Sequence, residues 1–307
     1  MPEAAAKEKN SYKQSLKTLK QLFKNADVNH VTFTGGEPMM SERFAELVLY
    51  TRMKKKEVTI ITNGNFASKK DYKQLIDFGV ALFELPIHSP NAEAHDYMTT
   101  IDGSWQKAVQ SAKDLLEMGA YVVPVIVVTK ANYLLMDDTL KFISEIGMKQ
   151  IMINRFNIGG RGISEAHNLL VGKEELQKTY QIANDASDKY GLSLTSNVCS
   201  PFCLLNPNDY PNIGFGSCSI NALNLPVTLD IKGNIRLCNH SPIVAGNIFE
   251  QKLEDIFNSS YVKNWIHEKP AFCADCEIYN ECLGGCRAAS EQVYKNNNIV
   301  NPILAKH

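Results

Sequence analysis

The sequence predicts an α/β protein: a parallel sheet covered by helices, followed by a small cysteine-rich segment. From about residue 10 to about residue 195, continuously apolar strand-like runs alternate with amphipathic helical runs. This is the pattern of repeated βα units. After that point the alternation gives way to Pro, Asn, Gly and Cys, and all eight cysteines lie between Cys199 and Cys286.

Five apolar runs predict the strands, in chain order at residues 30–35, 57–64, 81–89, 121–128 and 149–156. The segments around them repeat apolar residues at helical spacing. The clearest of these helices are at residues 15–24, 44–54, 71–79, 105–119 and 137–147. The order of elements predicts either an open doubly wound sheet or a barrel.

The cysteine-rich part predicts less regular structure. A hairpin is expected at residues 225–238 with Lys232 and Gly233 at its turn, and one amphipathic helix at residues 254–268. A segment this rich in loops needs an internal staple, which bound metal supplies. We therefore expect two domains, residues 1–195 and residues 196–307.

Polar residues follow the predicted strands. In open α/β sheets and barrels, the carboxyl ends of the strands form the ligand-binding edge. The candidate residues at this edge are Gly35, Gly36, Glu37, Thr62, Asn63, Gly64, His88, Ser89, Thr129, Lys130, Asn154 and Arg155.

Composition excludes several classes of protein. The chain of 307 residues is 44% hydrophobic and 21% charged, with a formal net charge of −1. With a net charge this close to zero, the protein has no overall electrostatic field that would attract nucleic acid or an anionic membrane. The apolar runs are too short to span a bilayer, and the N-terminus lacks the apolar core of a signal peptide. A cytoplasmic location follows, where clustered thiols act as metal ligands more readily than as disulfides.

The last four cysteines form the pattern C-x2-C-x5-C-x3-C, at Cys273, Cys276, Cys282 and Cys286. Cys218 and Cys238 precede them, and Gly233 lies five residues before Cys238. Three interpretations compete: iron–sulfur clusters, structural zinc, and ordinary buried thiols. The x5 and x3 intervals fit a zinc ribbon poorly, whereas iron–sulfur clusters take thiolate sets of this kind.

With the Gly-Gly-Glu-Pro turn at residues 35–38, these cysteines make the chain resemble the radical S-adenosylmethionine (SAM) enzymes that carry a SPASM domain. The resemblance covers about residues 10 to 290. It implies a partial (β/α)6 barrel lacking its first strand, followed by a domain that holds one or two auxiliary [4Fe–4S] clusters.

The resemblance also implies roles for the strand-end residues. Gly35, Gly36 and Glu37 would bind the methionyl amine of SAM. Thr62, Asn63, His88 and Ser89 would face the ribose or the substrate, and Arg155 would pair with the SAM carboxylate. Structural roles remain open for four of these residues: turn residues (Glu37, Asn63), a packed histidine (His88) and a surface ion-pair partner (Arg155).

By the same resemblance, Cys218, Cys238 and Cys286 bind the first auxiliary cluster, with Cys203 expected as its fourth ligand and Cys199 as the alternative. Cys273, Cys276 and Cys282 bind the second. The family often closes that second cluster with a later cysteine, and residues 287–307 contain none. The second cluster would then have a non-cysteine ligand or an open iron, or would not form.

The family's defining C-x3-C-x2-C motif holds the cluster that cleaves SAM to a 5′-deoxyadenosyl radical, and it is expected before the Gly-Gly-Glu turn. Residues 1–34 contain no cysteine. We expect an incomplete chain, or alternatively a degenerate protein, and in either case no SAM cleavage by the chain as given. The parent enzyme would modify a peptide or a cofactor precursor, with a flavodoxin or ferredoxin as electron donor. The alternatives are a non-catalytic iron–sulfur scaffold or peptide-binding protein, and a zinc-stapled module.

Overall fold

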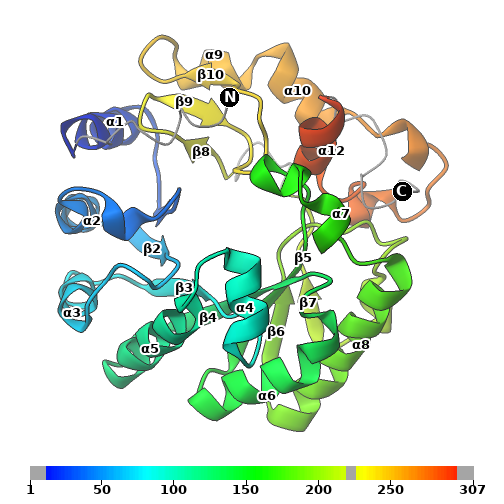
Figure 1. Cartoon of the computed structure of the whole chain (residues 1–307). Helices are drawn as coiled ribbons and strands as arrows, with labels where there is room; N and C mark the ends of the chain where they lie inside the picture. The colour runs from blue at the N-terminus through cyan, green and yellow to red at the C-terminus, as the bar shows by residue number, and fades with distance from the viewer. Residues whose placement is uncertain (1–11, 219–225, 296–307) are drawn as a thin grey trace.

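The computed structural model describes residues 12–218 and 226–295. Its main feature is a parallel sheet of seven strands in the order β1-β2-β3-β4-β5-β6-β7 (Figure 1). The strands are β1 (His30–Phe33), β2 (Glu57–Ile61), β3 (Leu82–Pro86), β4 (Val122–Val128), β5 (Gln150–Arg155), β6 (Ser193–Ser196) and β7 (Ile213–Phe215). Because every pairing is parallel, all seven carboxyl ends lie at one edge.

The first five strands confirm the five predicted ones. The last two were not predicted, because each is short and neither forms a long apolar run: β6 reads SLTS and β7 reads IGF. The sheet thus continues past the boundary expected at residue 195, and we propose that the sheet domain ends at Phe215 instead.

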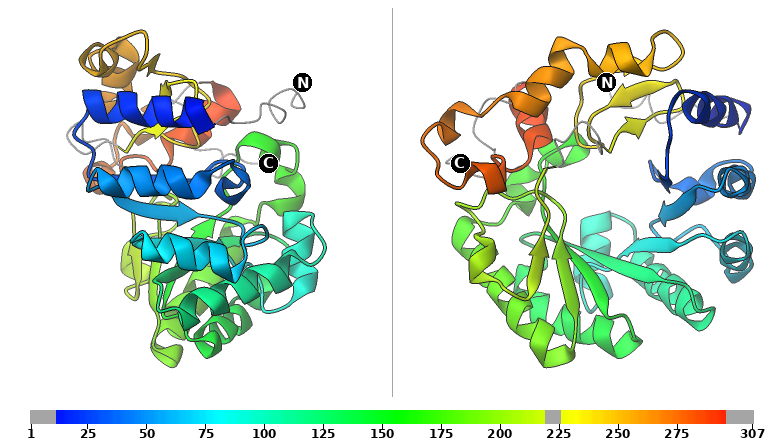
Figure 2. Two further views of the ribbon diagram at one scale, coloured as in Figure 1. Left: turned by 90° about the vertical axis from the view of Figure 1, so that its left-hand side faces the viewer. Right: turned by 180° about the vertical axis from the view of Figure 1, so that it is seen from behind.

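Helices cover the outer face of the curved sheet (Figures 1 and 2). They are α1 (Tyr12–Asn25), α2 (Phe44–Met53), α3 (Lys69–Asp77), α5 (Ser104–Glu117), α6 (Met136–Ile146) and α8 (Lys173–Tyr190). Two shorter helices, α4 (Ala92–Thr99) and α7 (Ala166–Leu169), lie elsewhere, and α7 lies beside the cysteine-rich part (Figure 1). The main core lies between the covering helices and the strands. On β3, Phe83 and Leu85 are fully buried in this core, while Glu84 lies on the opposite face of the sheet.

Local sequence explains how these helices start. At α3, the Ser68 hydroxyl accepts the Asp71 N–H at 3.3 Å, and the Asp71 carboxylate accepts the Ser68 N–H at 2.8 Å. Such reciprocal capping stabilises a helix by about 1 kcal/mol. The helix then buries Tyr72 and Leu75 against the sheet.

The cysteine-rich part contains a three-stranded antiparallel sheet, β8 (Thr228–Leu229), β9 (Asn234–Arg236) and β10 (Gly246–Asn247). The hairpin of β8 and β9 confirms the prediction around Gly233; Leu225, where it was expected to start, lies outside the described residues. Four helices follow: α9 (Leu253–Phe257), α10 (Ser260–His267), α11 (Tyr279–Cys282) and α12 (Arg287–Tyr294).

The single helix expected at residues 254–268 is wrong, because the chain breaks into α9 and α10. Ser259 has an extended backbone, with φ −62° and ψ 154°, and its hydroxyl accepts the Val262 N–H. A serine with this geometry caps a new helix rather than continuing the old one.

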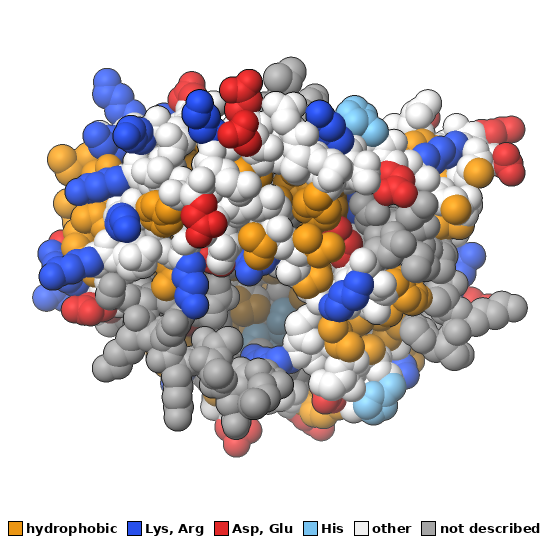
Figure 3. Space-filling model, turned by 90° about the horizontal axis from the view of Figure 1, so that it is seen from above, with side chains coloured by type: hydrophobic (Ala, Val, Ile, Leu, Met, Phe, Trp, Pro, Cys, Tyr) orange, Lys and Arg blue, Asp and Glu red, His pale blue; other side chains and the backbone are white. Residues whose placement is uncertain are grey.

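The small sheet contacts the first helix, so the cysteine-rich part packs against the start of the sheet domain (Figure 2). The Thr18 hydroxyl of α1 donates to the Ile231 carbonyl at 2.7 Å, and the Gln21 amide donates to the Ile248 carbonyl at 2.9 Å. Seen from above, the molecule is hollowed near the middle, and Lys and Arg side chains gather along one margin (Figure 3). Within the described ranges, no helix has the length and apolarity that a membrane span requires.

Candidate cofactor and cluster sites

The residues predicted to bind the cofactor lie at the carboxyl ends of four strands, and all of them are at the same edge of the sheet. Gly35 to Glu37 follow β1, Thr62 and Asn63 follow β2, His88 and Ser89 follow β3, and Arg155 is the last residue of β5. Strands β1, β2 and β3 are direct neighbours. The fold therefore gathers the first three groups side by side and places Arg155 farther along the edge.

The Glu37 carboxylate joins the ends of the first two strands. It accepts hydrogen bonds from the Thr62 hydroxyl at 2.6 Å, from the Asn63 N–H at 2.7 Å and from the Met39 N–H at 3.0 Å. Thr62 is buried, so its hydroxyl depends on this partner. Glu37 thus fixes the shape of the turn at the edge, and its role toward SAM stays a prediction.

The Gly35-Gly36 turn forms an open cradle. Gly35 has φ +141°, a conformation that side chains rarely adopt, and a Cβ at either glycine would meet no atom within 4 Å. Both residues are exposed, and neither N–H has a backbone acceptor within the described residues. A small polar group fits here, which is what the amino group of SAM requires.

His88 and Ser89 have partners inside the fold. The His88 Nδ1 accepts the Val127 N–H at 3.3 Å, and its ring stacks on His95 with centroids 5.1 Å apart. Burial lowers the pKa of His88 to about 3, and His95 adds to this effect. Ser89 is fully buried, its hydroxyl donates to the Asn91 carbonyl, and its own carbonyl accepts the Trp105 indole N–H. Cofactor contacts at both positions stay predictions.

Arg155 lies at the junction between β5 and the segment that leads to the first cysteines. It is 2% exposed, so the surface ion-pair interpretation does not apply. Its guanidinium donates to the Cys199 carbonyl at 3.0 Å, the Ser200 hydroxyl at 3.1 Å and the Asn157 side-chain oxygen at 3.2 Å. Because these bonds occupy most of its donors, Arg155 positions the Cys199 segment, and pairing with the SAM carboxylate stays untested.

The eight cysteines fall into two groups of four. The first group, defined as Cys199, Cys218, Cys238 and Cys286, gathers around the junction. The Cys199 and Cys218 thiols share a hydrogen bond, which raises the pKa of Cys199 and lowers that of Cys218. Burial raises the pKa of Cys238 to about 11, and the nearby Cys286 and Cys218 thiols add to the rise.

The second group is Cys203, Cys273, Cys276 and Cys282. Burial raises the pKa of Cys273 to about 11, with contributions from the other three thiols. The Cys282 sulfur accepts the Phe202 N–H at 3.2 Å, which brings the neighbouring Cys203 into this group. In the structure Cys199, rather than the expected Cys203, lies with the first group, because the chain turns at Pro201 between them. Which of the two thiols binds each cluster stays a prediction.

Two buried arginines supply positive charge beside these thiols. Arg155 acts on Cys199 and Cys286, and Arg287 acts on Cys218. Arg287 is 2% exposed, and its Nε and Nη1 atoms have no hydrogen-bond partner among the residues that the structure describes. Orphaned buried donors are costly, and a cluster held by thiolates carries the negative charge and acceptor sulfurs that would satisfy them. The residues present therefore fit an iron–sulfur cluster. The sequence analysis did not identify Arg287 or Asn157 as residues of the site. Nothing about an arginine directly after Cys286 indicates that it is buried.

The described thiols are not gathered around a single ion position. In the two described ranges, no three Cys, His, Asp or Glu side chains converge on one ion position. A zinc site needs its ligands around one point. A four-iron cluster takes one thiolate at each of four corners and suits a wider set.

Two family models match the sequence. The radical SAM superfamily model matches residues 3–146, and an iron–sulfur cluster-binding domain, SPASM, matches residues 218–277. The first match includes β1 to β4 of the parallel sheet, and the second includes the small antiparallel sheet and the cysteines from Cys218 to Cys276.

Two curated relatives match nearly the whole chain. The antilisterial bacteriocin subtilosin biosynthesis protein AlbA of Bacillus subtilis is 28% identical over 305 residues, which cover 94% of this chain and 63% of AlbA. The AdoMet-dependent heme synthase of Oleidesulfovibrio alaskensis is 23% identical and is covered over 74% of its length. The chain thus spans less than two thirds of AlbA.

Among solved structures, Streptococcus suis SuiB bound to S-adenosylmethionine has a similar fold, with a TM-score of 0.72 at 17% identity. The match covers 96% of this chain and 70% of SuiB. The agreement extends over both the sheet and the cysteine-rich part.

Proposed function

The chain belongs to the radical SAM family and carries a SPASM domain, and from this premise we propose that it serves peptide maturation and holds two auxiliary [4Fe–4S] clusters. The observation that carries the proposal is the arrangement of the eight thiols in two groups of four, next to an open Gly-Gly-Glu turn. In this family, SAM on a cluster of its own supplies the radical that removes a hydrogen atom from the substrate. A flavodoxin or ferredoxin would supply the electrons, and the reducing cytoplasm suits thiolate ligands.

A peptide is the substrate class we favour over a cofactor precursor. AlbA takes part in bacteriocin biosynthesis, and SuiB has been solved bound to its precursor peptide SuiA. The heme synthases among the relatives support the second class. The substrate enters beside the sheet edge, where Glu37 holds the ends of β1 and β2 together and His88 is held neutral by burial.

The polypeptide of residues 1–307 has all of its thiols in the two groups, so none remains to hold the SAM-cleaving cluster. We therefore expect the anaerobically reconstituted chain to bind about eight irons and to release no 5′-deoxyadenosine from SAM. Iron, sulfide and zinc analysis tests the cluster content. Stoichiometric zinc in place of iron would refute the proposal, and 5′-deoxyadenosine formation would refute the expected inactivity.

The substrate class has its own measurement. A fluorescent precursor peptide encoded beside the gene should bind the reconstituted chain in an anisotropy titration, and a tetrapyrrole precursor should not compete. Competition by the tetrapyrrole, without peptide binding, would favour the cofactor-precursor alternative.

A further inference from the structure

The segment from Cys199 to Cys203 runs against the segment from Cys282 to Cys286. Each carries two cysteines separated by three residues. A Cβ added to Gly285 would lie 2.7 Å from the Pro201 ring and 2.8 Å from the Pro201 nitrogen. Only a residue without a side chain allows this approach, and Gly285 also has φ +79°, which favours glycine.

This crossing sends one thiol of each segment to each side. On one side, the Arg155 guanidinium holds the Cys199 carbonyl and the Asn157 oxygen, while the Asn157 amide donates to the Cys286 sulfur at 3.4 Å. Cys199 and Cys286 therefore lie together in the first group.

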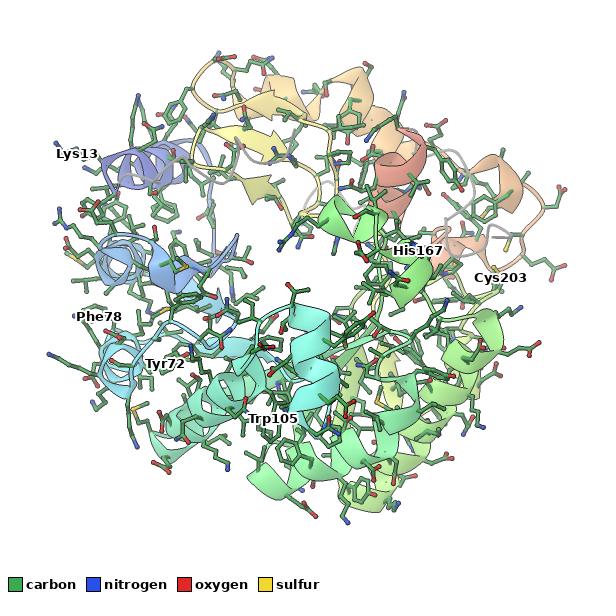
Figure 4. The ribbon with its side chains drawn as sticks, in the orientation of Figure 1. Lys13, Tyr72, Phe78, Trp105, His167 and Cys203 are labelled. Atoms are coloured by element: carbon green, nitrogen blue, oxygen red, sulfur yellow. The ribbon has the colours of Figure 1, made fainter. Side chains whose placement is uncertain are left out.

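On the other side, the Phe202 N–H donates to the Cys282 sulfur. A peptide N–H on a sulfur is typical of thiolates that bind clusters, because the ligated sulfur keeps negative charge. Cys203 follows directly, and it is exposed at the side of the molecule where the cysteine-rich segment runs (Figure 4). The Gly284 turn packs against the Cys273 sulfur, since a Cβ there would lie 3.6 Å from it.

The groups that act most strongly on Cys203 and Cys273 are thiols of the same group and two lysines. They are Cys282, Cys276 and Lys173 for Cys203, and the three other thiols and Lys269 for Cys273. Together with the Phe202 N–H bond to the Cys282 sulfur, this places Cys203, from the linker after β6, with the other three thiols of the second group.

Building on the proposed function, we infer that Cys203 is the fourth ligand of the second auxiliary cluster, while Cys199 completes the first. Both clusters are then closed by four protein thiolates, and neither presents an open iron to the substrate. Their role is electron transfer and stapling of the sheet domain to the cysteine-rich domain, rather than direct coordination of substrate.

The test separates the clusters before it removes a ligand. One background, Cys238→Ala, retains only the second cluster, and the other, Cys276→Ala, retains only the first; each should hold about four irons. Adding Cys203→Ala to the first background should lower its iron content at least twofold, or let an added small thiol shift the EPR spectrum of the reduced cluster. Adding Cys203→Ala to the Cys276→Ala background should change neither the iron content nor the EPR spectrum of the first cluster. Cys199→Ala should give the opposite pattern.

Cys203→Ser, which preserves the shape of the loop, guards against a folding defect and should also shift the EPR spectrum of the second cluster. The inference is overturned if Cys203→Ala alters only the first cluster, or if it leaves the second unchanged in iron content and spectrum. In both cases two clusters in the wild-type chain would leave the proposed function standing. A wild-type chain without iron–sulfur clusters would overturn both.

Discussion

Removal of the Glu37 carboxylate should loosen the cofactor edge of the sheet. The Glu37→Ala change deletes the acceptor for the Thr62 hydroxyl, the Asn63 N–H and the Met39 N–H. A hydrogen bond to a charged group contributes about 1.5–3 kcal/mol. Because Glu37 is half-buried and water can replace part of its role, we take the low end for the two short bonds to the end of β2 and expect a loss of about 3 kcal/mol.

The assay is urea unfolding of the reconstituted chain under anaerobic conditions, followed by tryptophan fluorescence. Glu37→Gln keeps one acceptor oxygen but turns an amide donor toward the Asn63 N–H, so it should lose about 1.5 kcal/mol. Exposed Glu42→Ala is the matched control and should stay within about 0.5 kcal/mol of wild type. If Glu37→Ala also stays within that margin, Glu37 does not hold the two strand ends together and the reasoning is refuted.

Four further predictions address other contacts. Arg155→Met should at least halve the iron bound by the first group, measured in the Cys276→Ala background, because the Cys199 segment loses its anchor. Gly35→Ala should cost about 1–3 kcal/mol in urea unfolding, since its φ is positive. Thr18→Val should cost about 1 kcal/mol by removing the bond to the small sheet. The pKa values of His88 and His95 fall from 6.5 to about 3 and about 4, so the stability they confer is present above pH 6.5 and is lost as the pH falls toward those values. Between pH 6.5 and 5, the double change His88→Asn and His95→Asn should reduce the slope of unfolding free energy by up to about 2.7 kcal/mol per pH unit; an unchanged slope would contradict it.

The sequence alone predicted the features of the fold that follow from residues close together in the chain. Runs rich in apolar residues located β1 to β5, because a strand covered by helices needs apolar residues on its buried face. The spacing of the last four cysteines and the Gly-Gly-Glu turn pointed to the family, since both depend on neighbours in the chain. Parallel order then placed Gly35, Thr62 and His88 at one edge without further information.

Other features depended on contacts between distant segments. The strands β6 and β7 are too short to show a pattern. They form because β6 pairs with β5 and β7 then pairs with β6. The break between α9 and α10 was hidden in a continuous amphipathic pattern and was decided by the capping geometry of Ser259.

The positions of Cys199 and Cys203 show most clearly what the sequence could predict and what depended on contacts between distant segments. Along the chain the two cysteines are equivalent, since both lie in one short linker that can reach either group. Only the packing of Pro201 on Gly285 separates them, and it directs one thiol to each side. The sequence by itself determined that thiols would gather and that the candidate cofactor residues would share one edge of the sheet, because those properties follow from periodicity and spacing. The tertiary structure decided which thiols share a group and what Arg155 holds, because these depend on segments meeting across the fold.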